Sequence, residues 1–146
     1  NGLTSTRSLE AILNKLLMIF ALVSLPCLAS ADVEDPCKVK GGGVMAGYQC
    51  VEKKMESADK ELNESYKEAI ARIGEEEKAL RETWSQTELV EPFRKAQRAW
   101  LKYRDAECEF TGLSSTPSPW QGVQIEECKL RMTLERVEYF NGVYVG

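Results

Sequence analysis

Apolar residues recur at helical spacing over residues 55–73, and this repeat limits the fold more strongly than any other pattern in the chain. Successive members lie 3, 4, 4, 3 and 4 residues apart, which places them on one stripe of an α-helix. They are Met55, Ala58, Leu62, Tyr66, Ala69 and Ile73. Because glutamate and lysine occupy the other faces, we expect a helix from Tyr48 to Arg81 that buries this stripe, with Gly74 weakening its end.

A second helix is predicted after a polar turn. Pro92 is tolerated only in the first turn of a helix, so this helix begins between Ser85 and Glu91. Ser85 and Thr87 are both available as N-cap residues, and we expect the helix to end at Phe110. Its core-facing positions are predicted to be Phe93, Ala96, Trp100, Tyr103 and Cys108.

A third helix is predicted beyond a loop. Residues 112–122 contain two glycines, two prolines and three serines, which is typical of a loop. The helix should then run from Val123 to Tyr139. One side of it carries Cys128, Met132, Glu135 and Tyr139. Because short connections favour antiparallel neighbours, the expected fold is all-α: a small bundle made of a long antiparallel helical hairpin plus a third helix.

An export signal is predicted at the start of the chain. Residues 16–28 form an uncharged apolar run between a basic flank and the small residues Ala29-Ser30-Ala31, a pattern typical of a secretory signal peptide. The run is shorter than the roughly 20 apolar residues of a membrane-spanning helix. We therefore expect a signal peptide over residues 1–31, cleavage near Ala31, a domain over residues 32–146 with no stable membrane span, and a periplasmic or secreted location.

Cys27 offers an alternative to simple cleavage, because bacterial lipoproteins keep a cysteine at the cleavage point. Such sites need small residues before the cysteine, whereas Leu25 and Pro26 precede Cys27. We favour loss of Cys27 with the signal peptide over a lipid anchor at this residue.

The cysteine count of the remaining domain indicates disulfides. An even number in a small exported domain argues for two bridges, so the bundle is expected to be disulfide-braced. The four cysteines are Cys37, Cys50, Cys108 and Cys128. Since the chain has no histidine, a zinc site would need all four thiolates, and their wide, irregular spacing argues against it. We expect neither a metal nor a cofactor.

The segment KAQRAWLKYRDAECEF, residues 95–110, allows three interpretations. Basic residues beside aromatic ones are typical of a phosphate-binding helix; here they are Arg94, Lys95, Arg98, Lys102 and Arg104. However, without Arg7, Lys15 and Glu10 the exported domain has 17 basic and 22 acidic residues, so nucleic acid is not an expected partner. A reactive Cys108 thiol is disfavoured because an oxidising compartment favours a bridge. We therefore interpret the segment as the inner face of a helix.

Arg104 and Asp105 raise a question of pairing. As sequence neighbours on a helix they point about 100 degrees apart and are not expected to pair well with each other. The expected partners lie on other helices and are Arg136, Glu61 and Glu64. A partly buried network of this kind would fix the register of the helices more than it adds stability.

Four segments together resemble the LprI-type lysozyme-inhibitor-like domain, which is a bacterial exported domain. That family has an early cysteine pair and segments similar to ADKELNESY (58–66), AQRAWLKYRDAEC (96–108) and CKLRMTLERVEYF (128–140). The resemblance covers about residues 37–140. The motif positions are Trp100, Tyr103, Arg104, Asp105, Thr133 and Arg136. We expect these residues mainly to build the fold.

Four cysteines allow three pairings. We favour Cys37–Cys50 together with Cys108–Cys128, because the second bridge would clamp two helices across the 112–122 loop and the first would pin the glycine-rich lead-in. The interval between Cys37 and Cys50 is wider than is usual in the family. The main rival joins Cys50 to Cys108, since an antiparallel hairpin brings these regions together.

The resemblance implies an envelope protein that binds and inhibits a lysozyme. Lysozymes cleave with two carboxyl groups in a cleft, and the common host enzymes are basic, so an acidic partner would be steered toward them. Two features are candidates for partner contact, an acidic cluster and a loop tryptophan. Their residues are Glu75, Glu76, Glu77 and Trp120.

The alternative is a non-enzymatic structural or adaptor module that binds another envelope protein. Catalysis is not expected, because histidine is absent and the serines gather in a loop with no base nearby in the sequence. The segment KGGGVMAGY, residues 40–48, lacks the ending of a phosphate-binding loop and is interpreted as a linker.

Overall fold

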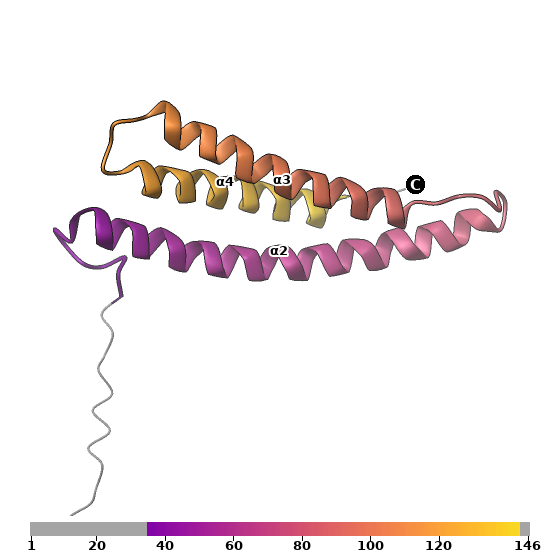
Figure 1. Ribbon diagram of the computed structural model, residues 1–146. Helices are drawn as coiled ribbons and strands as arrows, with labels where there is room; N and C mark the ends of the chain where they lie inside the picture. Colours follow the sequence, from indigo (N-terminus) through magenta and orange to yellow (C-terminus); the bar gives the residue numbers. More distant parts are fainter. Residues whose placement is uncertain (1–34, 144–146) are drawn as a thin grey trace, which may run out of the picture. The chain divides into compact units, whose positions relative to one another are not determined.

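The computed structural model describes residues 35–143, which form three α-helices and no strand (Figure 1). Helix α2 spans Gly43–Arg81, α3 spans Val90–Ser114 and α4 spans Gln121–Gly142. The all-α fold class predicted from the sequence is confirmed. The predicted signal peptide, its cleavage point at Ala31 and the alternative anchor at Cys27 lie outside the described residues.

Helix α4 joins the other two helices. It packs along both α2 and α3, whereas α2 and α3 touch each other at far fewer positions. Trp120 before α4 lies against Gly47 at the start of α2, and Phe140 near the end of α4 lies beside Arg72. Helices α2 and α4 therefore run in the same direction, and α3 runs antiparallel to both (Figure 1). Helices α2 and α3 therefore form a hairpin whose two helices are held apart, and α4 packs against both of them.

The predicted apolar stripe of α2 is the inner face of that helix. Five of its six members are buried, and Tyr66 is half-buried against the core. One cluster joins the middle of α2 to the end of α4 and contains Leu62, Ala69, Val137 and Phe140. A second surrounds the Cys108–Cys128 region and includes Met132. Trp100 packs against both clusters and connects them.

The predicted inner face of α3 is partly wrong. Ala96 is exposed, and Tyr103 exposes 56% of its surface. The inner positions are instead Phe93, Gln97, Trp100, Arg104 and Cys108. Their spacing of 4, 3, 4 and 4 residues follows the helical repeat better than the predicted series. Two of these positions are polar, and a pattern of apolar residues does not predict them.

The inner face of α4 differs from the prediction in a similar way. Cys128 and Met132 are buried as expected, but Glu135 is exposed and Tyr139 is 46% exposed. The remaining buried positions are Val123, Thr133, Val137 and Phe140. The helix also extends beyond the predicted limits, Val123 and Tyr139, at both ends.

The start of α2 and the end of α3 differ from the predicted boundaries, and glycine residues explain both differences. Helix α2 begins at Gly43, five residues before Tyr48. Gly41 and Gly43 have positive φ angles of 74 and 63 degrees, which turn the chain at the start of the helix. Helix α3 runs past Phe110 to Ser114. Gly112 is buried inside it, and a Cβ at this position would overlap the Ile125 side chain of α4. The glycine permits close helix packing, and the connecting loop shortens to residues 115–120.

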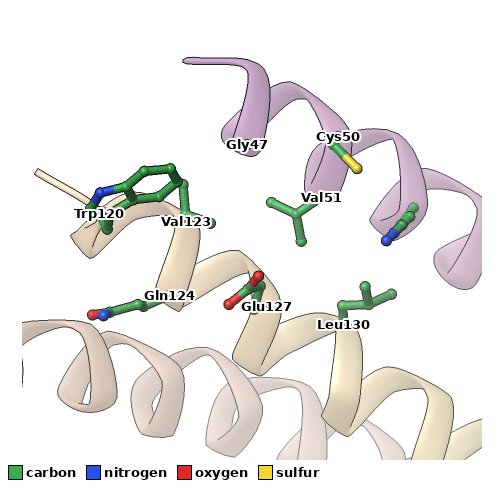
Figure 2. Close-up of a pocket in the computed structure, with 9 residues that line it drawn as sticks. Gly47, Cys50, Val51, Trp120, Val123, Gln124, Glu127 and Leu130 are labelled. Atoms are coloured by element: carbon green, nitrogen blue, oxygen red, sulfur yellow. The ribbon is translucent and has the colours of Figure 1, made fainter. Parts of the chain in front are cut away.

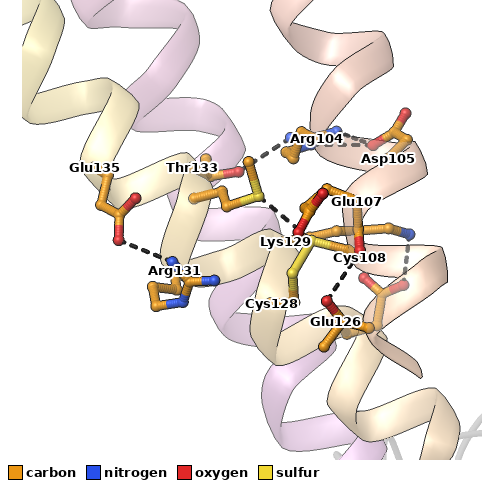
Figure 3. The surroundings of a disulfide bond; sticks show 12 residues. Arg104, Asp105, Glu107, Cys108, Glu126, Cys128, Lys129, Arg131, Thr133 and Glu135 are labelled. Atoms are coloured by element: carbon orange, nitrogen blue, oxygen red, sulfur yellow. Dashed lines mark hydrogen bonds and ion pairs between the residues drawn. A yellow bond between two sulfur atoms is a disulfide. The ribbon is translucent and has the colours of Figure 1, made fainter. Parts of the chain in front are cut away.

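The disulfide pairing favoured from the sequence is the one in the structure. Cys37 is bonded to Cys50, and Cys108 is bonded to Cys128. The second bridge joins the last part of α3 to α4, and both of its cysteines are buried (Figure 3). The first bridge ties the exposed lead-in, in which Asp35 also pairs with Lys53 at 3.1 Å, to α2.

Candidate functional site

Most residues of the motif meet where the three helices converge, but Tyr103 is exposed. The Trp100 ring of α3 is flanked by two guanidinium groups, with the Cζ of Arg104 5.5 Å and that of Arg136 5.2 Å from the ring centre. A cation over an aromatic face contributes about 0.5–2 kcal/mol, more as the site becomes drier. The side chain of Arg104 is only 11% exposed. This arrangement holds α3 against α4.

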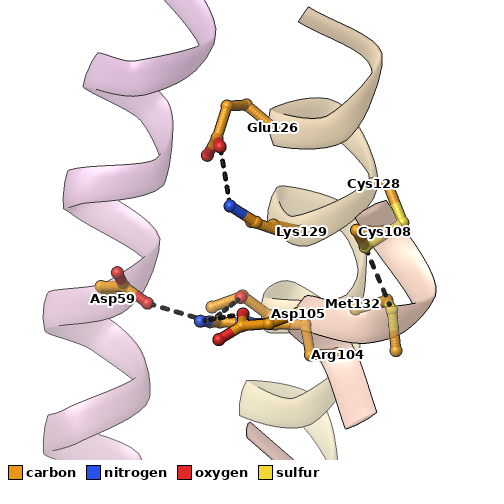
Figure 4. A network of polar contacts seen from close by, with 9 residues as sticks. Asp59, Arg104, Asp105, Cys108, Glu126, Cys128, Lys129 and Met132 are labelled. Atoms are coloured by element: carbon orange, nitrogen blue, oxygen red, sulfur yellow. Dashed lines mark hydrogen bonds and ion pairs between the residues drawn. A yellow bond between two sulfur atoms is a disulfide. The ribbon is translucent and has the colours of Figure 1, made fainter. Parts of the chain in front are cut away.

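Arg104 bonds residues of all three helices. Its Nη1 donates to the Thr133 hydroxyl of α4 at 3.0 Å and lies 3.4 Å from an Asp59 carboxylate oxygen of α2. Its Nε donates to Asp105 on its own helix at 3.0 Å (Figures 3 and 4). Thr133 is fully buried, so its hydroxyl needs a partner in the folded state. Arg104 provides one.

Two expectations about Arg104 are wrong. It does pair with Asp105, because the long arginine side chain lets both Nε and Nη2 reach within 3.0 Å of the neighbouring carboxylate. Its partner on α2 is Asp59, a residue that was not predicted from the sequence. The expected carboxylates Glu61 and Glu64 form no hydrogen bond or ion pair with Arg104, and Arg136 forms none with Asp105, within residues 35–143.

Arg136 of α4 makes a second polar contact between helices. Its Nε donates at 2.9 Å to the side-chain oxygen of Gln97, which is 94% buried in α3. The Tyr139 and Phe140 rings lie 4.4 and 4.9 Å from its guanidinium carbon. Burial lowers the pKa of Arg136 below its ordinary value. Gln97 was not singled out from the sequence; its position four residues after Phe93, on the inner face, is the signal that identifies it.

Glu77 caps the start of α3, a role that the charge pattern of the sequence did not indicate. One of its carboxylate oxygens accepts hydrogen bonds from the backbone N–H groups of Leu89 and Val90 at 2.8 and 2.9 Å, and the other lies 2.9 Å from Arg81. Helix α3 has no side-chain cap of its own, so Ser85 and Thr87 are not its N-cap. A carboxylate from the last part of α2 takes this role, which also suits the positive end of the helix dipole.

These bonds lower the pKa of the Glu77 carboxyl below its ordinary value of 4.5, chiefly through the Val90 and Leu89 N–H groups. A lowered pKa gives stability that is present above the ordinary value and is lost as pH falls through the folded value. Glu77→Gln should therefore lower the thermal unfolding midpoint by a few degrees at about pH 7, and the difference from wild type should shrink toward about pH 3.

Circular dichroism melting over this pH range checks the prediction. Glu76→Gln is the matched control, because it changes the same residue type one position away. A gap between wild type and Glu77→Gln that stays constant with pH would contradict the proposed role of the carboxylate.

The remaining candidates for partner contact lie at opposite ends of the bundle. Glu75 is exposed and Glu76 is half-buried, both beside Glu77 near the end of α2. Trp120 precedes α4 and is 43% exposed. Its ring lies against Gly47, and both residues line a groove of about 380 Å³, which Figure 2 shows between the starts of α2 and α4. A Cβ at Gly47 would lie 2.9 Å from this ring. Part of Trp120 is therefore used in packing.

The sequence of this chain matches a known protein family. Residues 37–140 match the family described as lysozyme inhibitor LprI. The chain belongs to this family. An uncharacterized protein of Rhizobium meliloti (strain 1021) is 29% identical over 116 residues, covering 77% of this chain and 83% of the relative. No solved structure matches the chain.

Two further findings concern the described part of this LprI-family chain. In residues 35–143 no helix combines the length and apolarity that crossing a membrane requires. In the same range no group of three or more histidine, cysteine, aspartate or glutamate residues is arranged to hold a metal ion.

Proposed function

We propose that this protein is an exported bacterial envelope protein that binds a basic lysozyme and inhibits it without catalysing a reaction. The match to the LprI family over residues 37–140 carries the proposal. Two properties agree with it. Both disulfides suit an oxidising compartment outside the cytoplasm, and the chain has 23 acidic against 19 basic residues, which favours association with a basic protein.

The three glutamates of the acidic cluster, residues 75–77, have different roles in this proposal. Glu75 and Glu76 carry charge that a basic partner would meet. Glu77 acts indirectly, because its carboxylate is engaged with α3. Trp120, the other candidate contact, is 43% exposed at the opposite end of the bundle, where part of its ring packs against Gly47.

A cell-wall lysis assay tests the proposed function. The purified, oxidised protein is added to a bacterial cell-wall suspension with a basic animal lysozyme, and the fall in turbidity is followed. We expect slower lysis, with an effect that weakens as salt rises, because ions screen the attraction between exposed charges. The control is the same protein after reduction of its two disulfides and alkylation of the four cysteines that form them.

Unchanged lysis at low salt would contradict the proposal. That result would favour the alternative considered from the sequence, an adaptor for another envelope protein.

A further inference from the structure

The hairpin tip, residues 75–91, extends beyond the end of α4. Arg72 of α2 donates a hydrogen bond to the carbonyl of Phe140 in the last turn of α4, whereas α2 continues for nine more residues to Arg81. At about 1.5 Å per residue, α2 extends about 13 Å past this contact. Figure 1 shows the turn that joins α2 to α3 lying beyond the end of α4.

The turn at this tip is fixed by hydrogen bonds. The N–H of Trp84 donates to the carbonyl of Leu80 at 2.7 Å, and the N–H of Thr87 donates to the carbonyl of Trp84 at 3.1 Å. Arg81 Nε donates to the carbonyl of Thr87 at 2.8 Å and pairs with Glu77. The backbone around Trp84 is thus held before any partner arrives, which reduces the ordering that binding would require.

Trp84 is the outstanding side chain of this turn. It is 64% exposed, although a large aromatic ring gains from burial. Its neighbours are uncharged, polar and all wholly or partly exposed: Thr83, Ser85, Gln86 and Thr87. The acidic residues lie behind them on the two helices and in the flanks of the turn. Over residues 75–91 there are six glutamates and two basic residues, a net charge of −4, equal to that of the whole chain.

We infer that the hairpin tip enters the substrate cleft of a basic lysozyme, with Trp84 as its anchor; this inference rests on the function proposed above. A projecting turn fits a concave site. Its hydroxyl, amide and aromatic groups suit a cleft that binds a polysaccharide, since such a cleft offers hydrogen-bonding groups for an uncharged, polar ligand. The exposed carboxylates of Glu75, Glu82 and Glu88 meet the basic surface around the cleft.

The opposite end of the bundle is less suited to a cleft. It exposes apolar groups, including Phe110 at 67% and Trp120 at 43%. Trp120 is partly packed against Gly47, so less of its ring is free for a partner than at Trp84, and α2, α3 and α4 all reach this end, so no single turn projects from it. Phe110 therefore offers a matched control for Trp84, because it is an aromatic side chain of similar exposure at the other end of the bundle.

The first test compares Trp84→Ala with Phe110→Ala in the full protein. Both side chains are exposed, so both variants should keep the wild-type circular dichroism spectrum. Isothermal titration calorimetry with a basic animal lysozyme should show at least about 30-fold weaker binding for Trp84→Ala, the size of effect found for interface anchors. Phe110→Ala should bind within about twofold of wild type.

The second test asks whether the cleft itself is occupied. The lysozyme is preloaded with a short soluble oligomer of N-acetylglucosamine at about ten times its Kd, which should weaken apparent binding of the wild-type protein about tenfold. Binding that is unaffected by the oligomer, or by Trp84→Ala, would overturn insertion of the tip while leaving inhibition intact. A wild-type protein that binds no lysozyme would overturn both the inference and the proposed function.

Discussion

Replacing Cys108 and Cys128 together by alanine is expected to lower the free energy of unfolding by about 3–4 kcal/mol. The bridge closes a segment of 20 residues, and such a constraint on the unfolded chain contributes about 3 kcal/mol. Both cysteines are also buried in the second core cluster beside Met132, so the smaller alanines leave a cavity. Urea unfolding followed by circular dichroism measures the change.

The Cys37–Cys50 bridge provides the internal comparison. It closes a segment of similar length, with a separation of 13 residues, so its removal frees the unfolded chain to a similar extent. However, Cys37 lies in an exposed lead-in, which is also freed in the folded state when the bridge is lost. The two gains in entropy partly cancel, and we expect a loss well below that of the buried bridge. Equal losses for the two double variants would contradict this argument.

Arg104→Ala is the second substitution with a large expected effect, a loss of about 2–4 kcal/mol in the free energy of unfolding. It removes the cation beside Trp100 and leaves the buried Thr133 hydroxyl without its donor. Because the Asp59 side chain is 48% exposed, its carboxylate regains water, which keeps the loss below that of a fully buried ion pair. The contribution of half-exposed Asp105 is small.

Two further measurements distinguish the loss of the Arg104 hydrogen bonds from the mere loss of a positive charge. Arg131→Ala removes an exposed arginine that pairs with Glu135 on the same helix at 3.1 Å, and should cost less than about 0.5 kcal/mol. A double-mutant cycle of Arg104→Ala with Thr133→Val should give a combined loss clearly smaller than the sum of the single losses, because both remove one hydrogen bond. Additive losses would mean that the bond at 3.0 Å adds nothing to stability.

Apolar periodicity was enough to predict the three helices, because most buried positions of α2 are apolar and follow one repeat. It failed for α3, where Gln97 and Arg104 occupy inner positions. These polar residues are buried because partners on α4 satisfy them. Such partners are separated by 39 and 29 residues in the chain, and no local pattern specifies them.

The candidate site, too, could be predicted from the sequence only in part. A run of three glutamates marked the end of α2 as acidic, but only the fold brings Glu77 to the N–H groups of Leu89 and Val90. Trp84 lies in the polar turn TWSQT, residues 83–87, and nothing in the sequence distinguishes it from its neighbours there. Its importance depends on its exposure and on the projection of the turn past α4, and both are properties of the packed bundle.

Amide hydrogen exchange with and without a basic lysozyme tests the central claim most directly: the family motif builds the bundle, and the hairpin tip contacts the enzyme. We predict that lysozyme slows exchange in residues 82–89 and leaves residues 97–108 unchanged. Slowing confined to residues 115–124 beside Trp120, or no change anywhere in the chain, would contradict it.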